Sequence, residues 1–212
     1  MNRNYLLQVI ICLVVVGLTA CGGNKAEEQT TQKGGMSLME SLQKRHSVRA
    51  FSQKQVPDSM LMDLLWAANG VNRPDGKRTA PSAINAQDID LYVGKADGCY
   101  HYVPADKKLV KVNGKDMRPI VAMQNNYVIT APVVVLLVSD LSKFSKHPER
   151  AENFADMDAG YVSQNIYLYC TSVGLGTVAD APDLKSTDII KFLGLPASNI
   201  PVMVHPVGYP AE

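Results

Sequence analysis

The sequence predicts an α+β fold, because its helices and strands do not alternate regularly and because one segment is strongly apolar. Periodicity indicates about five helices and about four or five strands, without the repeated strand–helix–strand order of a doubly wound sheet. Residues 133–137 are five consecutive apolar side chains, which is typical of a strand buried on both faces. The chain has 212 residues, of which 46% are hydrophobic, so one domain with a substantial core is expected.

Each helix is predicted from apolar residues spaced three or four apart, and each strand from alternation or an unbroken apolar run. Pro57 can open the second helix and Gly70 can end it. Residues 71–86 have no periodicity and contain two prolines, which is typical of an ordered binding loop. Helices are expected at 37–44, 57–70, 116–126, 151–173 and 185–193, and strands at 88–93, 100–103, 109–112, 132–139 and 202–207, with a short extended piece from 178.

The N-terminal segment resembles a bacterial lipoprotein signal peptide over residues 1–20. Its apolar run is too short to favour a mature transmembrane span, and it ends in a lipobox-like sequence, LTAC, whose Cys21 would carry the lipid. An ordinary signal peptide with an incidental cysteine is the alternative. Residues 21–35 are polar and predict a flexible tether before a domain at 36–212. We therefore expect a protein of the bacterial cell envelope, in the periplasm or at the outer membrane, held to a membrane by its lipid anchor only.

Composition excludes two classes of function. The formal net charge is +1, which creates no field that would attract nucleic acid. The four histidines are scattered and share no spacing with cysteines or acidic residues, so no metal site is predicted. Beyond the N-terminal segment the cysteines are Cys99 and Cys170, whose partly apolar surroundings favour buried free thiols over a disulfide.

A basic cluster at residues 45–51 (RHSVRAF) follows the first predicted helix. Guanidinium groups stay charged and their forked donors match phosphate oxygens, and a serine between two arginines can add a hydrogen bond to the same anion. The cluster is therefore either an anion site, most plausibly for a cofactor phosphate, or a helix end whose basic residues face solvent.

The sequence GLGTVA at residues 174–179 matches the G-x-G-x-x-A fingerprint of dinucleotide-binding proteins. That fingerprint requires a strand before the glycines and a helix after them, whereas here the long predicted helix comes first, so this interpretation is rejected. The segment is either a helix C-cap with a tight turn, or such a cap whose bare backbone lies against a flat ring.

Five motifs, in this order, resemble the FMN-dependent nitroreductase superfamily. They are RHSVRAF at 45–51, LLWAANG at 64–70, PSAINAQ at 81–87, GLGT at 174–177 and GYP at 208–210. The resemblance implies a nitroreductase-like fold, with a central, mostly antiparallel sheet flanked by helices, in a domain-entwined homodimer that binds two FMN molecules at its interface.

The resemblance also implies which residues bind FMN, and it implies no catalytic side chain. The FMN-binding residues would be Arg45, His46, Ser47, Arg49, Pro81, Ser82, Asn85, Gln87, Gly176 and Thr177. The first four would surround the phosphate, the ribityl chain and the pyrimidine edge. The next four would reach the flavin from the partner subunit, and the last two would line the other ring face.

The activity implied is that of an FMN-dependent oxidoreductase, which transfers hydride or electrons to a small flat acceptor such as a nitroaromatic or a quinone. Nicotinamide cofactors are scarce outside the cytoplasm, so the electron donor is left open, with NAD(P)H only if it is accessible. One alternative is a flavin-binding or interaction lipoprotein without turnover. Another is a flavin dehydrogenase acting on a peptide-derived substrate, because residues 73–82 and 100–102 are similar to the SagB-type branch.

Overall fold

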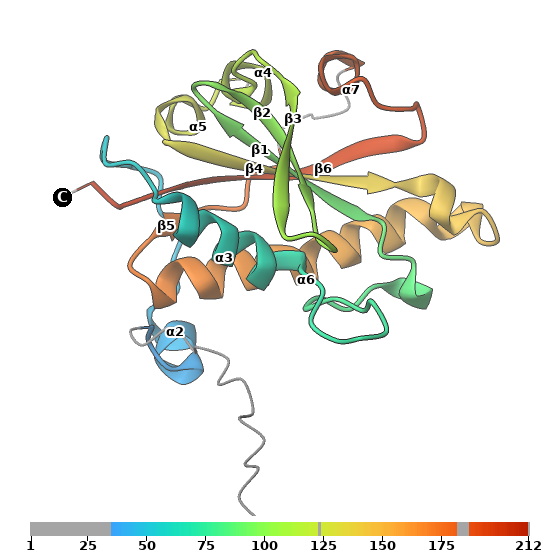
Figure 1. Ribbon diagram of the computed structural model, residues 1–212, viewed down its shortest axis with the longest axis horizontal. Helices are drawn as coiled ribbons and strands as arrows, with labels where there is room; N and C mark the ends of the chain where they lie inside the picture. Colours follow the sequence, from blue (N-terminus) through green and yellow to red (C-terminus); the bar gives the residue numbers. More distant parts are fainter. Residues whose placement is uncertain (1–34, 123, 182–186, 212) are drawn as a thin grey trace, which may run out of the picture. The chain divides into compact units, whose positions relative to one another are not determined.

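Six strands form one antiparallel sheet in the part of the chain that the computed structural model describes, which is residues 35–122, 124–181 and 187–211 (Figure 1). Every neighbouring pair in the order β3-β2-β1-β4-β6-β5 is antiparallel. The strands are β1 (Ile89–Lys95), β2 (Gly98–Val103), β3 (Lys108–Asn113), β4 (Val133–Asp140), β5 (Gly176–Thr177) and β6 (Asn199–Gly208).

Helices cover both faces of this sheet (Figure 1). On one face lie α3 (Asp58–Asn69) and α6 (Ala151–Ser172), and on the other α4 (Arg118–Ala122), α5 (Asn126–Thr130) and α7 (Thr187–Leu193). The first described helix, α2 (Leu38–Lys44), packs beside α6. Short 3₁₀ helices are η1 (Ala83–Asn85), η2 (Leu141–Phe144) and η3 (Pro148–Arg150).

The central strand β4 is buried on both faces, as its apolar run predicts. Its odd-numbered residues from Val133 to Leu137 join the core beneath α3 and α6. Its even-numbered residues from Val134 to Val138 join a second core beneath α4, α5 and α7. Because successive side chains of a strand point to opposite faces, an unbroken apolar run supplies both cores at once.

Most predicted elements are confirmed, including the helices at 37–44, 57–70 and 151–173 and the hairpin β2–β3. The single helix predicted over 116–126 is wrong, because α4 covers only Arg118–Ala122 and a separate helix, α5, begins at Asn126. The Asn125 N–H closes a turn onto the Ala122 carbonyl at 2.8 Å, and its side chain donates to Asp180, so a tertiary contact separates the two helices. The sheet also exceeds the predicted strand number, since Gly176–Thr177 pairs with the end of β6.

Some predictions fall on residues that the structure does not describe. These are the signal peptide over 1–20, Cys21, the tether up to residue 34, and the first two residues of the helix predicted at 185–193, of which 187–193 form α7. No helix within the described ranges is both long enough and apolar enough to cross a lipid bilayer.

The two cysteines of the described chain are free thiols buried in different cores. Cys99 of β2 lies in the core beneath α4 and donates its thiol to Met117 Sδ at 3.3 Å. Cys170 of α6 lies in the core on the opposite face of the sheet. Burial raises the pKa of Cys99 to about 12 and raises the pKa of Cys170 as well, so neither is a ready thiolate.

We predict that Cys99 and Cys170 form no disulfide and react with a thiol reagent only when the protein unfolds. Peptide mapping under non-reducing conditions, with alkylation before and after denaturation, measures both properties. A peptide pair linked through Cys99 and Cys170 would contradict the arrangement of the two cores, and fast alkylation of the native protein would contradict the burial.

Candidate functional site

Eight of the ten residues predicted to bind a cofactor fall into two sets that lie beside different parts of α6. Tyr167 contacts Arg45 and Ser47 of one set. Asp158 contacts Ala83 and lines a cavity together with Pro81, Ser82 and Gln87 of the other set. The nine-residue separation of these two side chains corresponds to about 13 Å along the helix axis. We call these sets the Tyr167 group (Arg45, Ser47, Gly176, Thr177) and the Asp158 group (Pro81, Ser82, Asn85, Gln87).

The Tyr167 side chain connects the basic cluster to the turn that follows α6. Its hydroxyl accepts a hydrogen bond from the Ala179 N–H at 2.8 Å and lies 3.1 Å from Ser47 Oγ. The Arg45 guanidinium lies over the Tyr167 ring, 5.1 Å from the centroid, which is a cation–π contact. Ser47 is exposed and Arg45 half-buried, so a hydroxyl and a fixed cation face solvent side by side.

Three motifs that are distant in the sequence meet at this end of the sheet. The Val48 N–H donates to the Thr177 carbonyl at 2.9 Å, which ties the basic cluster to β5. Phe51 forms an isolated bridge with Pro210, and the Ala211 N–H donates to the Ala50 carbonyl at 2.9 Å. The 45–51, 174–177 and 208–210 motifs therefore form one continuous edge.

Gly176 is required here by the chain's own packing. A Cβ at this position would stand 2.8 Å from Val48 Cβ, a distance that real Cβ atoms essentially never show. The group that packs closely against the Gly176 backbone is thus the Val48 side chain. The sequence had left open that a flat ring packs there.

The Thr177 side chain is buried and takes part in a hydrogen-bonded chain between the sheet and α6. Its Oγ1 lies 3.0 Å from His205 Nδ1, and His205 Nε2 lies 2.9 Å from Ser163 Oγ. His205 is fully buried on β6, and burial lowers its pKa to about 3. A neutral imidazole can satisfy both hydroxyl groups, because one ring nitrogen donates and the other accepts.

The other two residues predicted for this end have different surroundings. His46 is exposed and its Nδ1 lies 2.9 Å from the Lys44 carbonyl, so it caps its own helix end. Arg49 is also exposed and lies beside Tyr127, whose hydroxyl donates to Asp180 Oδ2 at 2.7 Å. Burial and the Asp180 contact raise the pKa of Tyr127, and Arg49 opposes this shift.

The Asp158 group lies on a loop with unusual backbone geometry. The φ angles of Ile84, Asn85 and Gln87 are 48°, 56° and 50°, in the left-handed region that non-glycine residues rarely adopt. Each such residue costs on the order of 1–3 kcal/mol and persists only where its surroundings fix it. Here the Gln87 N–H donates to Ser82 Oγ at 2.9 Å, and the Ala83 N–H lies 2.9 Å from both Asp158 carboxylate oxygens.

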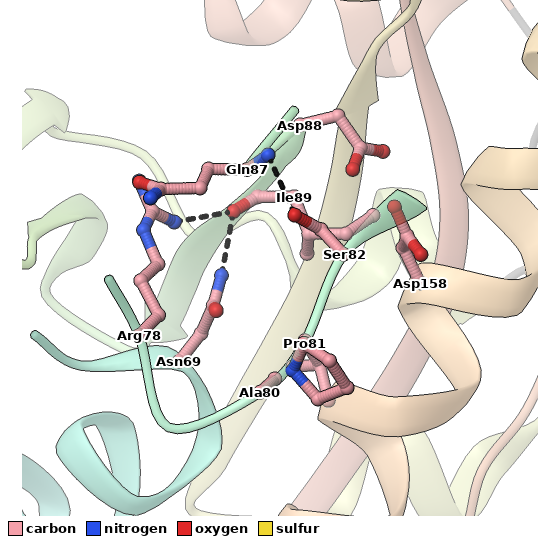
Figure 2. Close-up of a pocket in the computed structure, with 10 residues that line it drawn as sticks. Asn69, Arg78, Ala80, Pro81, Ser82, Gln87, Asp88, Ile89 and Asp158 are labelled. Carbon is pink, nitrogen blue, oxygen red and sulfur yellow. Dashed lines mark hydrogen bonds between the residues drawn. The ribbon is translucent and has the colours of Figure 1, made fainter. Parts of the chain in front are cut away.

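Beneath this loop, two buried carboxyl groups face a cavity of about 10 Å³ (Figure 2). Asp158 lies on α6, and Asp88 is the residue immediately before β1. The Ser139 hydroxyl donates to Asp88 Oδ2 at 2.5 Å. Burial, together with the neighbouring Asp88, raises the pKa of Asp158 to about 7. Figure 2 also shows Arg78 and Asn69, which donate to the Ile89 carbonyl at 3.0 and 2.8 Å.

Sequence reasoning missed the residues that hold both groups in place, namely Tyr167, His205, Asp158 and Asp88. Each is a single polar residue within or beside an apolar pattern, and none belongs to a short motif. The helical periodicity of 151–173 places Asp158 and Tyr167 on one element but does not indicate which loops they contact.

We predict that Tyr167→Phe destabilises the protein by about 1–3 kcal/mol, because the partly buried Ala179 N–H loses its acceptor. Denaturant unfolding measures this cost. Tyr161→Phe is the matched control, since Tyr161 lies on the same helix and is exposed, and it should change stability by less than about 0.5 kcal/mol. Equal effects of the two substitutions would contradict the role assigned to the Tyr167 hydroxyl.

We predict that His205 weakens the fold in mild acid. Its folded pKa lies below the unfolded value of 6.5, so below pH 6.5 the unfolded chain binds a proton that the folded chain does not. This costs up to about 1.4 kcal/mol for each pH unit below that value. Asp158 has the opposite effect on the pH dependence of stability. The test is therefore the slope of the unfolding free energy against pH, compared between wild type and His205→Asn. His147→Asn, at an exposed histidine, is the control, and identical slopes in all three proteins would refute the prediction.

Comparison with known proteins identifies the family of the chain. Over 202 residues it is 28% identical to a provisionally named nitroreductase of Methanocaldococcus jannaschii, covering 90% of this chain and 100% of that protein. A crystal structure of a provisionally named nitroreductase from Ralstonia eutropha JMP134 is 33% identical, with a TM-score of 0.78, and the match covers 85% of this chain and 86% of that one.

A third similar structure, of a provisionally named nitroreductase from Desulfovibrio desulfuricans in complex with FMN, shares the fold at 20% identity. Its TM-score is 0.60, and the match covers 84% of this chain and 88% of that one. Residues 42–209 match the family described as the Nitroreductase family. The predicted α+β, nitroreductase-like fold is thus confirmed, and the chain belongs to the nitroreductase family.

Proposed function

We propose that the protein is an FMN-dependent oxidoreductase that passes hydride or electrons to a small flat acceptor, such as a nitroaromatic or a quinone. The observation that carries this proposal is the meeting of the 45–51, 174–177 and 208–210 motifs beside Tyr167. Family membership and the FMN complex of a structural relative support it.

The residues of the Tyr167 group suit the phosphate end of FMN. Arg45 presents a planar cation that Tyr167 holds from one side, and Ser47 presents an exposed hydroxyl beside it. Together they offer the forked donors and the additional hydrogen bond that a phosphate accepts. Arg49, exposed four residues further on, supplies a second positive charge suited to the pyrimidine edge. Bound FMN would supply the redox chemistry, which these side chains do not.

A homodimer is part of the proposal, because the two groups lie at separate ends of α6 in one chain. A second copy would bring its Asp158 group to the Tyr167 group of the first. Apolar side chains suited to such an interface are exposed on α2 (Leu38, Met39, Leu42) and on α6 (Met157, Tyr161). Between the last two lies Gly160, where a Cβ would meet no atom within 4 Å, so another helix has room to approach closely.

The proposal also includes the location of the protein and the kind of electron donor that it uses. The lipoprotein signal predicted at 1–20, with lipidation at Cys21, supports a place in the cell envelope, where a donor other than NAD(P)H would be needed. That reasoning also supports a second candidate, a flavin-binding lipoprotein without turnover. The two are distinguished by whether chemically reduced bound flavin is reoxidised by a quinone or nitroaromatic faster than free FMN. The SagB-like segment at 73–82 supports a peptide-derived substrate as a further variant of the first candidate.

We predict that the purified protein takes up FMN and that Arg45→Ala weakens this binding at least about 10-fold, because a charged hydrogen-bond donor to the phosphate is lost. Visible absorption and a fluorescence titration with FMN measure the affinity. Lys44→Ala is the matched control, since Lys44 is an exposed neighbouring cation, and it should bind FMN like the wild type. A protein that binds no FMN would overturn the proposed function. Light scattering should give the mass of a dimer.

A further inference from the structure

The 83–87 segment presents its apolar and amide side chains to solvent from a strained backbone. Ile84 is 60% exposed and has a φ of 48°, although β-branched residues avoid this region most strongly. Asn85, also exposed, has a φ of 56°. Both the backbone strain and the exposure of an apolar side chain cost free energy. Contacts elsewhere in the structure must therefore fix the segment in this conformation.

Asp158 supplies that fixed point from a rigid element. Both of its oxygens lie 2.9 Å from the Ala83 N–H, where the segment begins. At the other end, Lys143 of η2 donates to the Gln87 carbonyl at 2.7 Å, and the Gln87 N–H donates to Ser82 Oγ. The segment is thus held at both ends while Ile84 and Asn85 between them remain free to meet a ligand.

The surroundings of Asp158 favour one proton shared with Asp88. The two residues are 1% and 0% exposed, and Asp88 Oδ1 has no N–H or hydroxyl donor within the described chain. Two neighbouring buried carboxyl groups do not both ionise readily. If Asp158 carries the proton, it can donate to Asp88 with one oxygen and accept from Ala83 with the other, which satisfies all three groups.

Other charges face this pair from three elements. Arg78, on the loop after α3, is partly buried and interacts electrostatically with Asp90 of β1 and with Asp88, while its guanidinium donates a hydrogen bond to the Ile89 carbonyl. Lys143 approaches from η2 through its bond to Gln87. Because Asp88 directly follows Gln87, repulsion between two ionised carboxylates would act between α6 and the end of the segment.

We propose that Asp158 is a positioning residue, which through its bonds to the Ala83 N–H and its burial beside Asp88 holds residues 83–87 in the conformation that presents Ile84 and Asn85 to a flat ligand. The identity of that ligand as FMN rests on the proposed function, but the positioning does not. Loss of the shared proton at higher pH loosens the segment and weakens binding, although Asp158 itself touches no ligand.

The test uses the full-length protein with Asp158→Asn, Asp158→Ala and the control Asp156→Asn, which removes an exposed carboxylate from the same helix. Hydrogen exchange of the 82–88 amides, corrected for intrinsic rates, is measured without FMN at about pH 6 and about pH 8.5. FMN affinity is measured by fluorescence titration in the same conditions. Asparagine keeps an acceptor for Ala83 and a donor for Asp88 but cannot titrate, so it imitates the protonated pair at every pH.

We expect the wild type and Asp156→Asn to exchange faster, and to bind FMN less tightly, at the higher pH. Asp158→Asn should match the wild type at pH 6 and show no further pH dependence. Asp158→Ala should raise exchange and weaken FMN binding by at least about 10-fold at both pH values, because the partly buried Ala83 amide loses its acceptor. Exchange in α6 itself should not change.

Unchanged exchange at 82–88 in Asp158→Ala would overturn the proposal, and so would Asp158→Asn behaving like Asp158→Ala. If the alanine variant does not fold, the comparison of pH dependence between wild type and Asp158→Asn decides alone, and equal dependence overturns the proposal. If the wild type binds no FMN while the exchange pattern appears as expected, the positioning role stands and the proposed function fails.

Discussion

The hydrogen bonds that Tyr167 and Asp158 accept from main-chain amides fix both ends of the candidate site to one helix. Both acceptors lie on α6, whereas the amide of Ala179 belongs to the segment after β5 and the amide of Ala83 begins the short 3₁₀ helix η1. These amides are partly buried, and leaving such a group without an acceptor costs up to about 1–3 kcal/mol, a substantial share of a typical domain's stability. The two segments therefore have little freedom to depart from α6, and the position of α6 is in turn set by its burial against the sheet.

That burial depends on β4, whose apolar side chains supply the cores on both faces of the sheet. On the α6 side, the fully buried His205 of β6 is one of several polar side chains within a largely apolar interface. It bonds Ser163 on the helix and Thr177 on the edge strand, and it remains neutral in doing so. Specific hydrogen bonds thus supplement hydrophobic packing where α6, the sheet and the residues of the Tyr167 group meet.

The layers of the fold could be predicted from the sequence because their signals are local. An unbroken apolar run predicts the central strand, and apolar residues at helical spacing predict α3 and α6. The motif at 45–51 predicted either an anion site or a solvent-facing helix end, and in the structure Arg45 and Ser47 both contact Tyr167. The contacts of Tyr167, His205, Asp158 and Asp88 could not be predicted, since each joins residues far apart in the chain. The split between α4 and α5 was missed for the same reason, because a contact from Asn125 to Asp180 helps to set it.

The placement of the cysteines makes the folding of the domain independent of the redox conditions around it. With Cys99 and Cys170 in cores on opposite faces of the sheet, neither oxidation to a bridge nor reduction of one forms part of folding. Such a domain needs no disulfide-forming machinery, and its stability does not follow the thiol–disulfide potential of the compartment. The same fold can therefore be kept when a chain is moved between reducing and oxidising environments.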